Sequence, residues 1–92
     1  MADFLWLEYL DVSGCVRVTD QGLDVLTAAC TGIYEIHARR CLKVGDAGVI
    51  ALSLNCKLIK VLDIQDCPLI TKDGIADVVA LQPRLNILHS VK

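Results

Sequence analysis

Residues 7–15 read Leu-Glu-Tyr-Leu-Asp-Val-Ser-Gly-Cys, and the pattern in this stretch decides the fold. Leu10 and Val12 lie two residues apart, a spacing that places both side chains on one face of a strand. The chain then reaches Thr19, whose hydroxyl can cap the first N–H groups of a helix, and apolar residues follow from Leu23 at helical spacing. The sequence therefore predicts a unit made of one strand, a turn and one helix.

This unit recurs along the chain at a step of 26 residues. Cys15, Cys41 and Cys67 are separated by this step, and so are Cys30 and Cys56. A unit of this size cannot bury its apolar side by itself, so we expect the units to stack, with a parallel sheet on the inside of an arc and helices on the outside. Further positions that agree at the same step are Leu7, Ile33, Ile59 and Leu85; Leu10, Ile36, Leu62 and Leu88; Val18, Val44 and Ile70; and Gly22, Gly48 and Gly74.

The turn after each predicted strand carries the most specific motif. It reads Cys-Val-Arg-Val-Thr-Asp-Gln-Gly-Leu in residues 15–23 and Cys-Pro-Leu-Ile-Thr in residues 67–71, with a second cysteine, Cys30, near the end of the first helix. This pattern resembles the cysteine-containing leucine-rich repeats of F-box/leucine-rich-repeat proteins, and residues 48–56 are similar to the antagonist of mitotic exit network family.

The resemblance implies an α/β leucine-rich-repeat solenoid, a right-handed arc like that of ribonuclease inhibitor, with about three and a half repeats. We expect a single domain over residues 1–92. Its repeats would cover residues 7–32, 33–58 and 59–84, followed by a partial repeat over residues 85–92.

In such proteins the repeats recognise other proteins, so the resemblance implies a protein–protein interaction module. Its most specific implication is substrate recognition, as an adaptor in degradation that depends on an F-box-type (SCF) ubiquitin ligase, with ligase subunits or substrates as partners. Two alternatives stay open: a free-standing regulatory binding protein unconnected to ubiquitin, for example in cell-cycle regulation, and a truncated repeat fragment. No F-box pattern precedes the repeats in residues 1–6.

Composition argues against several other classes of protein. The net charge is −2, and only Arg39 and Arg40 stand together as a basic pair, so we expect no nucleic-acid partner. No stretch approaches the ~20 apolar residues of a membrane span, and the N-terminus lacks the basic start of a secretory signal. We therefore expect no membrane partner and an intracellular location, in the cytoplasm or the nucleus.

The five cysteines indicate structure rather than chemistry. The Cys-x-x-Cys pair of most zinc sites does not occur, and an odd count without a secretory signal indicates a reducing compartment. We predict that Cys15, Cys41 and Cys67 face the core as small apolar residues, with no metal and no cofactor. We also predict no catalysis, because His37 should point out of the sheet while Cys41 points into the core.

The candidate binding site is the concave face, formed by the strand positions that point out of the sheet. The 26-residue step arranges them in three rows: Tyr9, Glu35, Val61 and Ile87; Asp11, His37, Asp63 and His89; and Ser13, Arg39, Gln65 and Val91. The residues that we predict to contact a protein partner are Tyr9, Asp11, Glu35, His37, Arg39, Arg40, Asp63 and Gln65.

The row of alternating aspartate and histidine allows three interpretations. Its members can form exposed cross-strand ion pairs, which contribute little to stability, a polar stripe that binds a partner, or an Asp/His metal site. We hypothesise that His37, between Asp11 and Asp63, favours its charged form, which would make binding sensitive to pH.

Two further features concern the helices and the ends of the array. Gly22, Gly48 and Gly74 fall in the first helical turn, where glycine costs up to ~1 kcal/mol relative to alanine. We infer that the backbone there approaches the neighbouring unit too closely for a side chain. Open strand edges at the ends invite pairing with other chains, so end-to-end self-association and a small cap formed by Phe4 and Trp6 both stay open.

Overall fold

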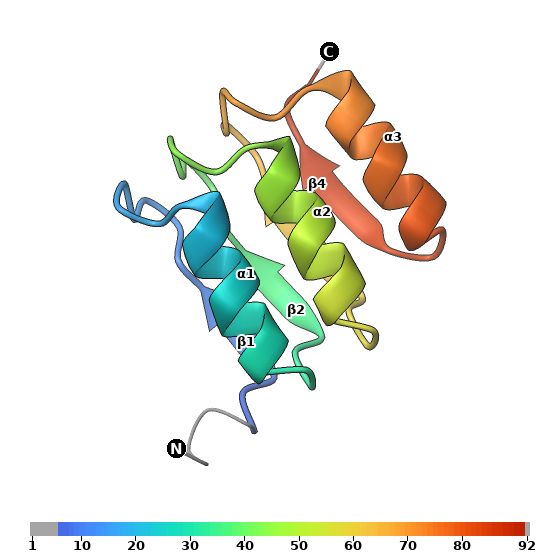
Figure 1. The fold of residues 1–92 in the computed structure, drawn as a ribbon. Helices are drawn as coiled ribbons and strands as arrows, with labels where there is room; N and C mark the ends of the chain where they lie inside the picture. The colour runs from blue at the N-terminus through green and yellow to red at the C-terminus, as the bar shows by residue number, and fades with distance from the viewer. Residues whose placement is uncertain (1–5, 92) are drawn as a thin grey trace.

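The computed structural model describes residues 6–91 (Figure 1). Strands and helices alternate along the chain, as predicted, and the strands form one parallel sheet in the order β1-β2-β3-β4. The three helices lie side by side on one face of that sheet (Figure 1). The elements are β1 (Tyr9–Asp11), α1 (Asp20–Ala29), β2 (Glu35–His37), α2 (Asp46–Asn55), β3 (Val61–Ile64), α3 (Lys72–Leu81) and β4 (Asn86–His89).

The helices begin at hydrogen-bonding caps. The hydroxyl oxygen of Thr19 accepts the N–H of Gly22 at 3.1 Å in α1, and the Thr71 hydroxyl oxygen accepts the N–H of Gly74 at 3.3 Å in α3. Gly45, at the same place before α2, has no side chain for this role. Helix α3 stops at Leu81, two residues before Pro83, which cannot continue a helix.

The core lies between the sheet and the helices and is built almost wholly from aliphatic side chains and cysteine. Most of its members in the second unit are fully covered, whereas several equivalent side chains of the first unit are only partly buried. The most deeply buried large side chains are Leu23, Ile33, Ile36, Val44, Val49, Leu52, Leu62, Ile64 and Val78.

The register predicted from the 26-residue step is confirmed for the first three strands and wrong for the fourth. Tyr9 pairs with Glu35 and Glu35 with Val61, as predicted. In β4, however, Val61 pairs with Asn86 and Leu62 with Ile87, one residue earlier than predicted. A shift of one residue turns every side chain to the opposite face. Ile87 therefore packs against the core instead of pointing outward, and Leu88, predicted to be inside, is exposed.

The shift removes two other residues from their predicted rows. Asp63 pairs with Leu88, and His89 pairs with Ile64, so His89 does not continue the row of His37. Val91 packs against the core and does not continue the row of Ser13.

Hydrogen bonds at the start of each strand explain the shift. The carbonyl of Glu8 accepts the N–H groups of both Tyr34 and Glu35, at 2.9 and 3.3 Å, and the Tyr34 carbonyl likewise accepts Lys60 and Val61, at 2.7 and 3.2 Å. At the fourth strand the Lys60 carbonyl accepts only Asn86, at 3.0 Å. The stretch between paired residues of β3 and β4 is therefore one residue shorter than the same stretch between the earlier strands, and the pairing of β4 moves one residue earlier.

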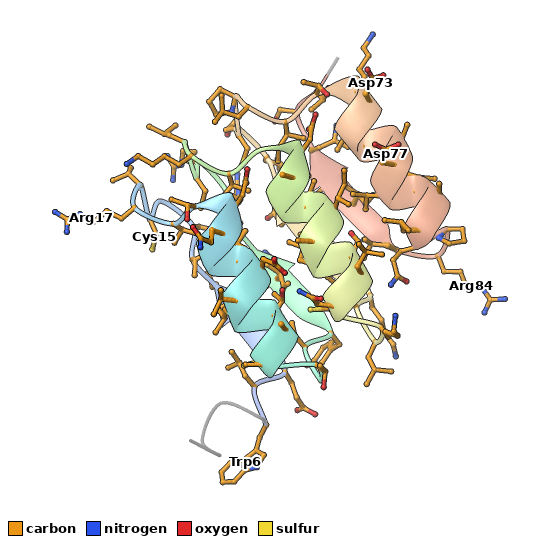
Figure 2. All side chains as sticks on the ribbon, in the orientation of Figure 1. Trp6, Cys15, Arg17, Asp73, Asp77 and Arg84 are labelled. Atoms are coloured by element: carbon orange, nitrogen blue, oxygen red, sulfur yellow. The ribbon has the colours of Figure 1, made fainter. Side chains whose placement is uncertain are left out.

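Three cysteines lie in the turns between strand and helix, two more end α1 and α2, and four of the five are buried. The thiol of Cys41 donates to the carbonyl of Val12 at 3.2 Å, and the thiol of Cys67 donates to the carbonyl of Ala38 at 3.0 Å. Each turn cysteine thus reaches back to the preceding strand. Cys15 is exposed (Figure 2), so its predicted place in the core is wrong, because the described residues offer it no preceding strand.

We expect iodoacetamide to label Cys15 far faster than any other cysteine of the native chain. Burial raises the pKa of the Cys41 and Cys67 thiols, and it raises the pKa of Cys56 to about 11, which keeps the thiolate that reacts at a very low level. Mass spectrometry of timed samples measures the order, with the Cys15→Ser variant as the control that should stay unlabelled. Labelling of Cys41 at the rate of Cys15 would contradict a buried turn.

The start of the chain gives one further correction. Trp6 is 73% exposed and projects away from the sheet and helices (Figure 2), so it forms no cap over the first unit. Phe4, the other residue of the predicted cap, lies outside the described residues.

Candidate functional site

The candidate site is the face of the sheet opposite the helices, which we call the helix-free face. Alternation along the strands directs one set of side chains to the core and the other set to this face. Residues from β1, β2 and β3 meet there in the predicted register, with Asp11 beside His37 and His37 beside Asp63.

His37 lies at the centre of this face and has three close neighbours. Its Nε2 lies 2.5 Å from a carboxylate oxygen of Glu35, and its Nδ1 lies 3.2 Å from a carboxylate oxygen of Asp63. The Tyr9 ring lies against the imidazole, with 5.3 Å between the ring centroids and 37° between the ring planes. Together with Arg39, whose Nε lies 3.8 Å from Asp63, these residues form what we call the His37 cluster.

Asp63 anchors the cluster from beneath. Its side chain is only 6% exposed, and it is fully engaged, because one oxygen accepts the backbone N–H and the side-chain amide of Gln65 at 3.3 and 3.1 Å. A buried carboxylate is stable only when it is paired and hydrogen-bonded in this way. The interpretation of the row as exposed ion pairs is therefore wrong for Asp63.

The second carboxylate on His37 is not the predicted one. Asp11 accepts the backbone N–H of Ser13 at 2.9 Å and makes no hydrogen bond with the imidazole, although its charge still acts on His37 through space. Glu35, two residues before His37 on the same strand, takes the place that we assigned to Asp11. The period of two along a strand, which puts residues 35 and 37 on one face, was the signal that could have identified it.

These contacts change the charge states of the two central groups. The hydrogen bond with Glu35 raises the pKa of His37 above its ordinary value, the bond with Asp63 adds to this, and partial burial opposes it. Burial alone would raise the pKa of Asp63, but the hydrogen bonds from His37 and Gln65 lower it overall. The cluster therefore favours an imidazolium beside two carboxylates.

We expect an NMR titration to place the pKa of His37 above 6.5, the ordinary value of histidine. The Glu35→Gln variant should lower this pKa, whereas Asp11→Asn should change it much less, because only Glu35 bonds to the ring. A His37 pKa at or below the ordinary value in the native chain would contradict the geometry.

The sign of the pH effect on stability follows from these shifts. A raised folded-state pKa means that His37 stabilises the fold fully below pH 6.5 and loses this effect as pH rises through its folded-state pKa. The lowered pKa of Asp63 contributes stability above pH 3.8, and this is lost as pH falls through its folded-state value. The combined contribution of His37 and Asp63 to stability is therefore largest between pH 3.8 and pH 6.5.

The two arginines of the predicted site differ in position. Arg39 has a side chain that is 49% exposed and lies beside the cluster, and its backbone N–H donates to the Ser13 hydroxyl at 3.1 Å. Arg40 lies in the turn after β2 with a left-handed φ of 57°, and its N–H donates to the carbonyl of Gln65 at 3.0 Å. Arg40 is exposed but belongs to the turn at the end of the rows.

The cluster is not arranged to hold a metal ion. Its two carboxylates contact different nitrogens of the His37 ring, so the three groups do not converge on one point. Over residues 6–91, no group of three or more His, Cys, Asp or Glu side chains has the arrangement of a metal site.

His37 and Cys41 lie on opposite sides of the sheet, with Cys41 fully buried. In the same described part of the chain, none of the helices has the length and apolar character needed to cross a membrane.

Comparison with known proteins agrees with the alternating units. The Leucine Rich repeat family model matches residues 5–26. F-box/LRR-repeat protein 12 of Arabidopsis thaliana is 28% identical to this chain over 64 residues. These two similarities support leucine-rich repeats in the chain. The match covers 70% of this chain but only 16% of that relative, so the chain spans a small part of the relative's length. Leucine-rich-repeat domains are generally binding modules for proteins, built from stacked units that present an extended surface.

Proposed function

We propose that the chain is a protein-interaction module that binds its partner on the helix-free face and performs no catalysis. The observation that carries this proposal is the His37 cluster, in which the buried Asp63 contacts His37 and Arg39 and the ring of Tyr9 packs against His37. Tyrosine and arginine are enriched among the residues that dominate binding energy, and side chains that are fixed beforehand lose less entropy on binding. The proposed contact residues are Tyr9, Asp11, Glu35, His37, Arg39, Arg40, Asp63 and Gln65.

A more specific role is that of a substrate-recognising adaptor for an F-box-type ubiquitin ligase. The cysteine-containing turns and the similarity to a protein named for its F-box and leucine-rich repeats support this role. The stacked units would form the arc of a solenoid, and the role would place the chain in the cytoplasm or the nucleus. The similarity of residues 48–56 to the antagonist of mitotic exit network family favours the alternative, a regulator that acts by occupying its partner.

Quantitative affinity purification from cells with three single variants tests the binding face. Tyr9→Ala and Arg39→Ala remove exposed members of the His37 cluster, and each should weaken capture of the partner roughly 30-fold or more, the effect of losing a dominant contact. Asp77→Ala is the control, because Asp77 is exposed on α3, on the opposite side of the molecule (Figure 2).

The outcomes separate the possible roles. Ligase subunits that are captured by the natural chain and lost with Tyr9→Ala support the adaptor, whereas a regulatory protein captured without ligase subunits supports the alternative. Equal loss of the partner with Asp77→Ala and Arg39→Ala, or loss with neither, would contradict binding on the helix-free face.

A further inference from the structure

An aspartate joins each helix to the start of the next one. Asp20, the first residue of α1, accepts the backbone N–H of Gly45 at 2.7 Å, just before α2 begins. Asp46, the first residue of α2, accepts the backbone N–H of Thr71 at 2.8 Å and its hydroxyl at 2.5 Å, just before α3 begins. We call this contact between successive helices the aspartate clasp.

The clasp requires glycine at the third position of the receiving helix. A Cβ atom on Gly48 would collide with the carboxylate of Asp20, and one on Gly74 would collide with that of Asp46. Both glycines are buried by the preceding unit. The close approach inferred from the sequence is therefore confirmed at these two positions.

The start of α1 has the glycine and the backbone N–H that receive an aspartate in the later helices, but within residues 6–91 no aspartate contacts them. Gly22 takes the place of Gly48 and Gly74, but it is exposed, and a Cβ there would meet only the Thr19 hydroxyl oxygen, at 3.5 Å. The backbone N–H of Thr19, equivalent to that of Thr71, donates no hydrogen bond within residues 6–91. The close approach inferred from the sequence is absent at Gly22 in this part of the chain.

An apolar edge surrounds this empty half of the clasp. Five side chains of the first unit are partly buried, whereas their counterparts one step later are completely covered. Each pair occupies the same place in its unit, so the difference measures what a preceding unit would cover. The pairs are Leu7 and Ile33, Leu10 and Ile36, Val12 and Ala38, Val18 and Val44, and Leu26 and Leu52.

The last helix of the array lacks the aspartate that would complete the clasp. The position of Asp20 and Asp46 is occupied in α3 by Lys72, whose ammonium group can only donate hydrogen bonds. A second copy stacked by this end would place a lysine opposite the Thr19 N–H, a contact between two donors. The occupant must therefore differ from this chain at that position.

We propose that the edge formed by β1 and the start of α1 is a binding surface for a further leucine-rich-repeat unit, one whose helix begins with aspartate. The carboxylate of that unit accepts the Thr19 N–H and lies over Gly22, as Asp46 does with Thr71 and Gly74. The strand of the unit pairs with β1, and its apolar residues cover Leu10 and Val12. This surface is separate from the helix-free face, so the proposal does not depend on where the protein partner binds.

The test supplies such a unit at the correct register. A copy of residues 33–58, which contains Asp46, is inserted between Trp6 and Leu7 of the full chain, so that the 26-residue step is preserved. We expect a single thermal transition at a higher temperature than that of the natural chain. We also expect hydrogen exchange of the Thr19 N–H to slow by roughly tenfold or more, the effect of one hydrogen bond to a charged group.

Two matched variants isolate the clasp. Replacing the aspartate of the inserted copy with lysine, as at Lys72, should restore fast exchange at Thr19 while leaving the insert in place. Gly22→Val should do the same in the extended chain, yet leave the natural chain folded, because the space at Gly22 is open.

Two results would overturn the proposal. The first is an inserted unit that unfolds separately at a lower temperature, with Thr19 exchanging as in the natural chain. The second is a natural chain that sediments as a dimer and becomes monomeric with Gly22→Val, which would make a second copy the occupant.

Discussion

Replacing Gly74 with alanine is expected to lower the free energy of unfolding by about 2 kcal/mol. The new methyl group would occupy the position of the Asp46 carboxylate, which must then swing away and leave both the N–H and the hydroxyl of Thr71. The carboxylate of Asp46 can rotate away, but its Cβ atom, 2.9 Å from the new methyl group, cannot, so the cost combines the lost hydrogen bonds with residual overlap. Alanine also favours the helix by up to ~1 kcal/mol relative to glycine, and the expected loss of stability is the net value after this gain.

Gly22→Ala is the matched control, and urea unfolding measures both variants. This change should leave stability unaltered or increase it by up to ~1 kcal/mol, since it gains helix propensity at a site with open space. In the background of Asp46→Ala, the Gly74→Ala change should cost clearly less, because the carboxylate is gone and only the close approach of the two Cβ atoms remains. A Gly74 variant as stable as the Gly22 variant would show that the clasp contributes nothing.

Leu62→Ala is expected to cost about 3 kcal/mol, the second large effect. Leu62 is completely buried in β3, between Ile36 and Ile87 of the neighbouring strands, and its truncation leaves a cavity in the core. Leu88→Ala is the control, because Leu88 is 38% exposed and should cost less than about 1 kcal/mol.

The same pair of variants tests the register of the fourth strand. The 26-residue step predicts that Leu88 stands in the row of Leu62, whereas the structure places Ile87 there. If Leu88→Ala is as costly as Leu62→Ala in urea unfolding, while Ile87→Ala costs little, the structural register of β4 is incorrect.

The units, the core and three of the four strands could be predicted because apolar residues and cysteines recur at one step. The fourth strand could not, since the shift depends on how many N–H groups share the Lys60 carbonyl, and this leaves no trace in the hydrophobic pattern. The exposure of Cys15 was mispredicted for a related reason. Cys15 occupies the same position in the repeat as Cys41 and Cys67, and its neighbours in space differ.

The candidate site was predicted in its position but not in its contacts. The step placed His37 and Asp63 side by side, which the structure confirms. The 26-residue step relates residues on neighbouring strands, so it does not identify Glu35, which contacts His37 within the same strand. The Gln65 side chain turns back to donate a hydrogen bond to Asp63, a local arrangement that residue spacing does not encode.

On the helix side of the sheet, the hydrogen bonds between successive units also have a direction. Cys41, Thr71 and Gln82 all donate hydrogen bonds to groups that precede them in the chain, at Val12, Asp46 and Ser53 respectively. During synthesis, each unit that leaves the ribosome would therefore meet acceptors that are already displayed by the unit before it. The strands behave differently, because the N–H groups of Val12, Gly14 and Arg40 donate to carbonyls that follow them in the chain, so the hydrogen bonds of each strand are completed only when the next unit has been made.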